Sequence, residues 1–225
     1  MGVPTVSAIG AGGLEQGVPA AVARVRGELQ RRGIDSVYCA DGAAAVAYLL
    51  SRIPAGATVM NGGSTTLKQI GFLAALAEGP YEWLRPRIMA MDDPDERTRM
   101  RRRATTADYF FGGINALTTS GEILNADGSG NRLAAYSFGA GKLFLVAGVN
   151  KIVPDLASAF ERLRNEAARE ESRHMGVSTP CALTGRCDND ACRGPERQCG
   201  KILIIENERI PGRLCVVIVG ETLGY

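Results

Sequence analysis

Two short, uninterrupted apolar runs place the strongest limit on how this chain can fold. Leu143 to Val149 and Cys215 to Val219 contain no charged side chain. Both are far shorter than the roughly 20 residues that a helix needs to cross a bilayer, so we expect neither to span a membrane. Strands that are apolar on both faces are typical of a parallel sheet covered by helices on its two sides. The runs therefore predict buried strands of an α/β protein.

Segments with helical spacing alternate with these strand-like runs. Val22, Val25 and Leu29 form an apolar stripe on one expected helix, Asp41 is expected to cap a second, and Pro154 to open a third. This order predicts a mainly parallel sheet with helices on both faces, and ligands of such sheets bind outside the carboxyl ends of the strands. The expected helices cover residues 19–32, 41–52, 64–77, 94–107 and 154–169, and the expected strands cover 34–39, 57–60, 87–91, 108–117, 122–125, 143–149, 201–206 and 214–219.

Length and charge narrow the class of protein. With 225 residues, one core is the first expectation and two cores an alternative. The chain has 26 basic and 24 acidic residues, a net charge of +2, so no global field would draw it to nucleic acid or to an anionic membrane. The start of the chain lacks the basic residues and apolar run of a secretory signal, which predicts a cytoplasmic location. We expect a flexible segment over residues 1–18 and one α/β domain over 19–225, with a cysteine-rich loop at 172–200.

Four of the six cysteines lie within this loop and suggest a metal centre. Cys181, Cys187, Cys192 and Cys199 could supply a full set of thiolate ligands for zinc or for an iron–sulfur cluster. The loop has few large apolar side chains, and metal ligation would supply the free energy that orders it. The alternative is four reduced thiols, or a pair that oxidises. Cys39 and Cys215 fall in expected strands, where we predict small core residues.

A glycine turn between a strand and a helix is the second candidate site. Asn61, Gly62, Gly63, Ser64 and Thr65 could bind a small anion through backbone N–H groups and hydroxyls. The alternative is a tight turn in which Ser64 only caps the helix. Asn150 and Lys151 follow the strand over 143–149 and are expected at the same edge of the sheet, where Lys151 could neutralise the anion.

A polar loop and a hairpin supply further candidates. Asn131 and Arg132 close the loop over residues 127–132 and could bind the same ligand, while Glu122 in the hairpin is a weak candidate for a catalytic carboxylate. Three other features are expected to carry no function. They are the glycine-rich residues 10–13, the arginines of 97–103, which follow acidic residues on one helix, and His174, the only histidine.

Several segments taken together resemble the lactate-utilization (LUD) domain family. They are Asn61 to Ser64, Thr119 to Glu122, Asp127-Gly128 with Gly130 to Arg132, and Ala147 to Pro154. The similarity runs from about Ala20 to Tyr225, and Thr179 to Cys187 together with Glu221 to Tyr225 resemble one branch of the family. The resemblance implies the fold of sugar-phosphate isomerases and coenzyme A transferases (NagB/RpiA/CoA transferase-like). It also implies a link to the oxidation of L-lactate to pyruvate through iron–sulfur proteins, which would be partners of this chain.

One departure from that branch leaves the identity of the centre open. The second and third cysteines of the branch form a C-x2-C pair, whereas four residues separate Cys187 from Cys192 here. The family offers no agreed catalytic residue. Three hypotheses follow: a redox-associated accessory or subunit of lactate or organic-acid oxidation, an enzyme acting on a phosphorylated sugar or coenzyme A ester with a structural zinc lid, and a non-catalytic redox-sensing module. The sequence leaves the oligomeric state open, and a homo-oligomer is compatible with it.

Overall fold

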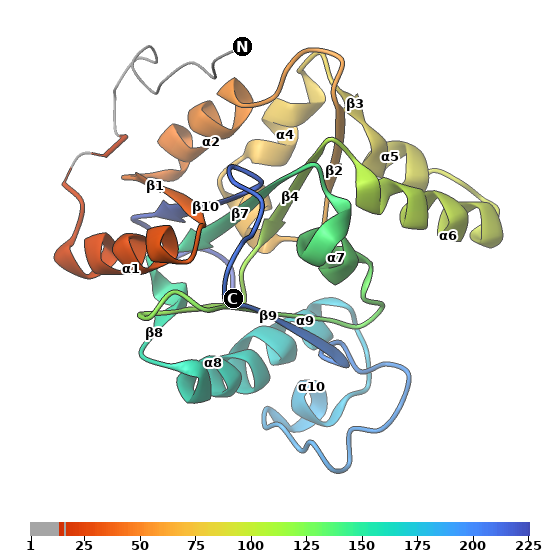
Figure 1. The fold of residues 1–225 in the computed structure, drawn as a ribbon. Helices are drawn as coiled ribbons and strands as arrows, with labels where there is room; N and C mark the ends of the chain where they lie inside the picture. Colours follow the sequence, from red (N-terminus) through yellow and green to blue (C-terminus); the bar gives the residue numbers. More distant parts are fainter. Residues whose placement is uncertain (1–13, 16) are drawn as a thin grey trace.

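The computed structural model describes residues 14, 15 and 17–225, and two β-sheets organise them (Figure 1). The larger sheet has six strands in the order β1-β10-β7-β4-β2-β3, and each neighbouring pair is parallel. The two apolar runs of the sequence form the adjacent strands β10 and β7. The predicted α/β fold with a mainly parallel sheet is therefore confirmed. The strands are β1 (Asp35–Cys39), β2 (Thr58–Asn61), β3 (Glu82–Trp83), β4 (Tyr109–Gly113), β7 (Lys142–Gly148) and β10 (Leu214–Val219).

A second, four-stranded sheet lies beside the first. Its order is β8-β5-β6-β9, with β5 and β6 forming the expected hairpin and β9 antiparallel to β6. The sequence patterns predict strands at β6 and β9 and join β5 to β4 in one segment over 108–117, which the structure divides between the two sheets. They predict no strand at β8. The strands of this second sheet are β5 (Ala116–Thr118), β6 (Ile123–Asp127), β8 (Ile152–Val153) and β9 (Lys201–Ile205).

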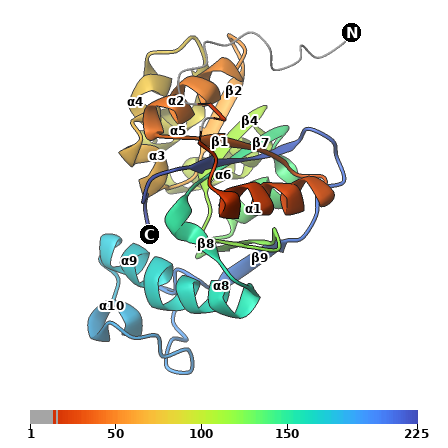
Figure 2. The ribbon, with the colours of Figure 1, turned by 90° about the vertical axis from the view of Figure 1, so that its left-hand side faces the viewer.

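Helices cover both faces of the six-stranded sheet (Figure 2). On one face, α2, α3 and α4 bury Leu49, Leu67 and Phe72 in one core with alternate residues of β10 and β7. On the other, α1 buries Val25 and Leu29, which recur on one side of the helix as their spacing requires. The helices are α1 (Ala20–Arg31), α2 (Gly42–Ser51), α3 (Thr65–Gln69), α4 (Phe72–Ala77), α5 (Leu84–Met89), α6 (Pro94–Arg103) and α7 (Asn131–Ala134).

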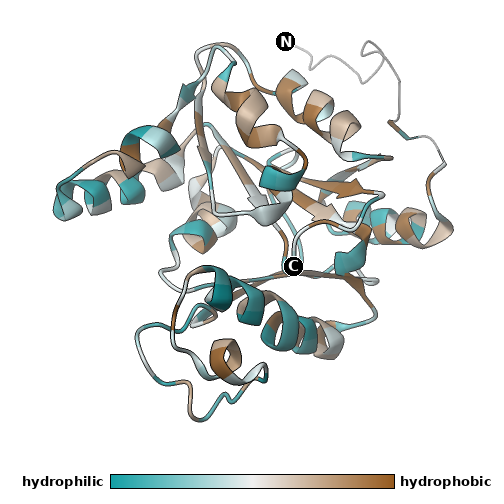
Figure 3. Ribbon diagram, turned by 180° about the vertical axis from the view of Figure 1, so that it is seen from behind, coloured by the Kyte–Doolittle hydropathy of each residue, from teal (hydrophilic) through white to brown (hydrophobic). Residues whose placement is uncertain are grey.

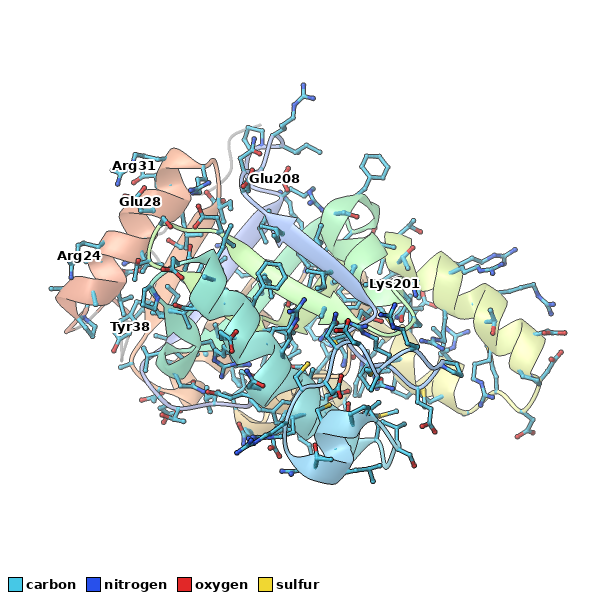
Figure 4. The ribbon with its side chains drawn as sticks, turned by 90° about the horizontal axis from the view of Figure 1, so that it is seen from below. Arg24, Glu28, Arg31, Tyr38, Lys201 and Glu208 are labelled. Carbon is cyan, nitrogen blue, oxygen red and sulfur yellow. The ribbon has the colours of Figure 1, made fainter. Side chains whose placement is uncertain are left out.

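The four-stranded sheet is packed between α1 and a long helical segment. Leu117 and Ile123 face the core under α1, whereas Leu124 faces Ala159 and Leu163 on the opposite side. The helical segment comprises α8 (Leu156–Arg162), a π-helical turn (Leu163–Ala167) and α9 (Ala168–His174), and α10 (Pro180–Thr184) follows it. Several strands are coloured as apolar in Figure 3, while α6, which buries no residue, is largely hydrophilic. The outer face of α1 carries the Glu28–Arg31 pair (Figure 4).

Three local expectations need correction. Residues 87–91 were predicted as a strand, but most of them belong to α5, where Ile88 alone is buried and Leu, Arg and Met favour a helix. The helix expected over 64–77 is divided in two at Gly71, whose φ of 79° ends α3. The helix expected to end near Arg169 continues to His174.

At the start of the chain, most of the segment expected to be flexible and the glycines at 10–13 lie outside the described residues. Leu14 pairs with Cys39, and Glu15 forms an ion pair with Arg26. The described residues include no helix that is long and apolar enough to cross a membrane.

Gly112 in β4 offers a test of core packing. A methyl group there would lie 1.7 Å from Oη of Tyr136, a fully buried ring that packs edge-on against Phe110. We expect Gly112→Ala to destabilise the protein by roughly 1–3 kcal/mol, because the buried ring has no space to move into. Gly27→Ala, in the interior of α1 with no atom within 4 Å of the added methyl, should instead stabilise it by about 0.5–1 kcal/mol. Urea unfolding of both variants measures these changes, and equal effects would contradict the assignment.

Candidate functional site

A cavity of about 690 Å³ opens at the carboxyl ends of β2 and β4 and beside the turn that follows β7. Its walls come from the turn after β2, α5, α6, the loop before α7 with the start of α7, the helical segment α8–α9 and the cysteine-rich loop. This is the edge of the sheet at which the alternation of helices and strands predicts a ligand site. Of the predicted ligand-binding residues, the cavity brings together Gly62, Gly63, Ser64, Thr65, Asn131, Arg132 and Lys151.

The glycine turn is shaped by its close contact with Arg132. A methyl group at Gly62 would lie 2.7 Å from Cδ of Arg132, so a side chain there would displace the guanidinium group. Ser64 caps α3 by accepting a hydrogen bond from the Leu67 N–H at 3.2 Å, and it also lines the cavity. Because α3 has only five residues, its dipole adds little to anion binding. Asn61 lies beneath the cavity, where its side chain accepts a hydrogen bond from Trp83 Nε1 at 2.8 Å.

Arg132, in α7, and Arg101, in α6, are held by polar groups of the turn after β2 and of residues 127–131. Arg132 Nη1 donates to the Gly63 carbonyl at 3.4 Å, and its Nε lies 3.4 Å from the Asp127 carboxylate without forming a hydrogen bond. Arg101 donates to Asn131 Oδ1 at 3.0 Å and to Ser129 Oγ at 3.3 Å. Lys201, labelled in Figure 4, holds the loop from β9 by donating to the Gly128 carbonyl at 2.7 Å. These contacts orient two guanidinium groups at one wall of the cavity.

Lys151 is the most buried cationic group of the cavity. It is 3% exposed, and its Nζ donates to Thr66 Oγ1 at 3.0 Å. No carboxylate of the described residues lies within ion-pair distance of this amine. Burial, together with the smaller effects of the nearby charges of Arg162 and Arg132, lowers the pKa of Lys151 to about 7. The proximity of Lys151 to the glycine turn, expected from the sheet edge, is present in the structure.

Two other predicted residues lie outside this cavity. Asn150 uses its side chain to fix the C-terminal segment, because its Oδ1 accepts a hydrogen bond from the Leu223 N–H at 3.0 Å. Glu122 forms an ion pair with Arg32 at 2.7 Å and also accepts hydrogen bonds from Ser120 and Thr118. Burial opposes its ionisation, yet these hydrogen bonds and Arg32 lower the pKa of Glu122 overall. The carboxylate therefore joins the hairpin to α1, and it is not a residue of the cavity.

The four loop cysteines do not form a ligand set. Among residues 14, 15 and 17–225, no three His, Cys, Asp or Glu side chains are grouped so that they could hold a metal ion. Cys181 belongs to α10 and is buried, and its Sγ lies 3.4 Å from Thr179 Oγ1 and 3.8 Å from Ser172 Oγ. The expected convergence of the four sulfur atoms on one point is therefore not met in this conformation.

The thiols are nevertheless close enough to influence one another. Burial, followed by the neighbouring Cys199, raises the pKa of Cys187, and burial also raises the pKa of Cys192. Both groups are thus held as neutral thiols, and a metal ion would have to displace their protons. Cys199 in addition lines the cavity. Cys39 and Cys215 are buried in β1 and β10, as expected of core residues.

Part of the positive charge of the cavity was not predicted from the sequence. The cavity is lined by five basic residues, Arg85, Arg97, Arg101, Arg132 and Lys151, and by two acidic ones, Asp127 and Glu171. The arginines of α6 were expected to carry no function, but Arg97 and Arg101 line the cavity. Their spacing of four residues places them on one side of a helix, which was a usable signal. Which way that side faces depends on tertiary packing.

Comparison with known proteins identifies a family and a similar fold. The chain matches the LUD domain family over residues 22–219. It belongs to the LUD domain family. Its fold is similar to the crystal structure of a DUF162 family protein from Deinococcus radiodurans, with a TM-score of 0.52 and 12% identity over 89% of this chain and 96% of that one. The delta subunit of eIF2B from Chaetomium thermophilum gives a TM-score of 0.30 at 16% identity, covering 51% of this chain and 49% of that one. No curated protein matches the sequence.

Substitution of Lys151 tests the burial of its charge. The unfolded chain takes up a proton at Lys151 below a pKa near 10.5, whereas the folded LUD domain does so only below about 7. As the pH falls from about 10.5 to about 7, Lys151 therefore lowers the free energy of unfolding by about 1.4 kcal/mol for each pH unit. We expect Lys151→Met to raise the melting temperature at pH 7, with a gain that shrinks as the pH approaches 10. Lys68→Met, at an exposed position of α3, is the control and should show no such trend. Scanning calorimetry across this pH range makes the measurement, and a constant difference would count against a neutral Lys151.

Proposed function

We propose that this LUD-domain protein binds a small organic anion in the cavity and acts as a redox-associated accessory or subunit in the utilization of lactate or a related organic acid. Its partners would be iron–sulfur oxidoreductase proteins. The observation that carries the proposal is Lys151, a buried amine without a carboxylate partner among the described residues, in a cavity with three more basic than acidic side chains. Membership of the LUD family supports the link to lactate.

The charge of the cavity favours an anionic ligand. Buried cations are normally paired, because desolvation of an unpaired charge is unfavourable. Here the protein supplies the cations and only part of the negative charge. An anion bound by Arg132 and Arg101, beside Lys151, would complete the pairing of these cations.

Its size and polar groups favour a small ligand. A volume of 690 Å³ falls within the usual range for small-molecule sites. The hydroxyls of Ser64, Thr65 and Thr66 and the amide of Asn131 add hydrogen-bonding groups to the lining. A carboxylic acid with a neighbouring oxygen substituent would use both the guanidinium groups and these hydroxyls.

Binding measurements on two arginine variants test this proposal. Calorimetric titration with L-lactate and with pyruvate should show binding that weakens as ionic strength rises. Arg101→Gln should weaken the affinity about tenfold or more, because a hydrogen bond to a charged group contributes roughly 1.5–3 kcal/mol. Arg99→Gln is the matched control, since Arg99 is exposed on the same helix and does not line the cavity.

Equal effects of the two arginine changes would contradict the assignment of the site. If inorganic phosphate binds and neither carboxylate does, a phosphorylated substrate replaces the organic acid as the ligand class. Binding of none of the three anions would end the proposal.

We further propose that Cys181, Cys187, Cys192 and Cys199 ligate an iron–sulfur cluster or a zinc ion once the loop rearranges. The support is the number of thiols in one short loop. The cysteines as they stand do not fit such a centre, so a change in loop conformation is part of the proposal. Formation of metal–thiolate bonds would supply free energy for that change and would have to exceed the cost of removing the thiol protons.

Elemental analysis and visible spectra of anaerobically purified protein test the cysteine proposal. We expect stoichiometric iron with visible absorbance, or stoichiometric zinc without it. A variant with Cys187, Cys192 and Cys199 all changed to Ser should lose the metal, whereas Cys215→Ala, in the core strand β10, should retain it. Absence of both metals from the unaltered protein, or equal loss from the two variants, would rule out ligation by the loop.

A further inference from the structure

The position of Lys151 exposes its amine to the cavity alone. It ends the short turn after β7 and is 3% exposed, yet it lines the cavity. Its Nζ donates a hydrogen bond to the Thr66 hydroxyl at 3.0 Å. Because no carboxylate of the described residues pairs with it, nothing there holds the amine as an ammonium ion.

The surroundings of Nζ restrict the direction from which a partner can approach. On one side, a methyl group at Gly224 would lie 3.1 Å from Nζ, so the C-terminal backbone covers the amine closely there. Gly224 has a φ of +61°, a conformation that glycine adopts at no steric cost. The open side of the amine is the cavity, which also contains Arg132 and Arg101.

A neutral amine is also the chemically reactive form. The pKa of Lys151 is lowered to about 7 by burial and by Arg162 and Arg132, so a large fraction of the amine is unprotonated at neutral pH. An amine with a free lone pair attacks carbonyl carbon, and a lysine in a desolvated, cationic site is activated for this reaction. Simple binding of a carboxylate does not require such an amine.

We propose that Nζ of Lys151 forms an imine with the carbonyl carbon of a small keto or aldehyde acid whose carboxylate is held by the cavity arginines. This inference rests on the proposed binding of organic anions and names the class of ligand, an acid that also carries a carbonyl group. The nitrogen lone pair forms the C–N bond while the carbonyl oxygen takes up a proton. Loss of that oxygen as water and of the remaining N–H proton leaves a C=N bond, with no net oxidation or reduction.

Reductive trapping tests the imine. The intact protein is incubated with pyruvate or glyoxylate and sodium cyanoborohydride, and the mass is then measured. We expect one addition per chain, equal to the mass of the acid less one oxygen atom. Because the chain has only four lysines, peptide mapping can separate Lys151 from Lys68, Lys142 and Lys201. L-lactate, which has the carboxylate but no carbonyl group, should give no addition.

Two variants and one independent measurement complete the test. Lys151→Met should abolish the addition, and Lys68→Met, at an exposed position outside the cavity, should leave it unchanged. If Lys151→Met does not fold, the peptide map of the unaltered protein still decides. Labelling absent from Lys151, or equal at all four lysines, overturns the imine. Calorimetric binding of pyruvate and L-lactate is scored separately, so a ligand that binds without labelling Lys151 removes the imine and leaves the proposed function standing.

Discussion

The close approach of three chain segments at the end of β7 fixes the site. A methyl group at Gly148 would lie 2.5 Å from both Asn150 Oδ1 and the Glu221 carbonyl, so only glycine allows these groups to meet. The Val149 N–H donates to that carbonyl at 3.1 Å, and the Leu223 N–H donates to Asn150 at 3.0 Å. The strand is buried among its neighbours and cannot shift to relieve a clash. These contacts therefore fix the position of Lys151, which lies against the C-terminal segment and beside Thr66.

The contrast between two buried cations shows why Lys151 differs from a structural charge. Arg213 is 6% exposed, but Glu208 lies 2.7 Å from its guanidinium group and the Tyr136 carbonyl accepts a hydrogen bond at 2.8 Å. The desolvation of Arg213 is thus offset within the protein. Lys151 is equally buried and has a hydroxyl as its partner. The fold maintains an unfavourable charge environment at the cavity, which is a common property of functional sites.

The sequence predicts the parts of this fold that depend on local patterns. Residues that are apolar throughout, as in β7 and β10, can only be buried, and Asp41 caps α2 with a 2.8 Å hydrogen bond to the Ala44 N–H because the local backbone dictates it. The strand expected at 87–91 fails because a short stretch with one buried residue carries no clear period. The contribution of Arg101 and the removal of Glu122 from the site could not be predicted, since both depend on which distant element packs against them.

The cysteine-rich loop and the anion cavity share a wall, and this links their chemistry. Gln198 and Cys199 line the cavity, and a methyl group at Gly128, in the loop that leads to Arg132, would lie 3.3 Å from the Arg197 carbonyl. Cys181 is held in α10 by its contacts with Thr179 and Ser172, and Cys199 belongs to the wall, so the rearrangement proposed for the four cysteines would involve a residue of the cavity. A movement of this wall that accompanies the proposed metal ligation would also alter the proposed anion site, and such a coupling is reciprocal by linkage. In the proposed function, a carboxylate bound by Arg132 and a metal at the cysteines would therefore influence each other through this wall.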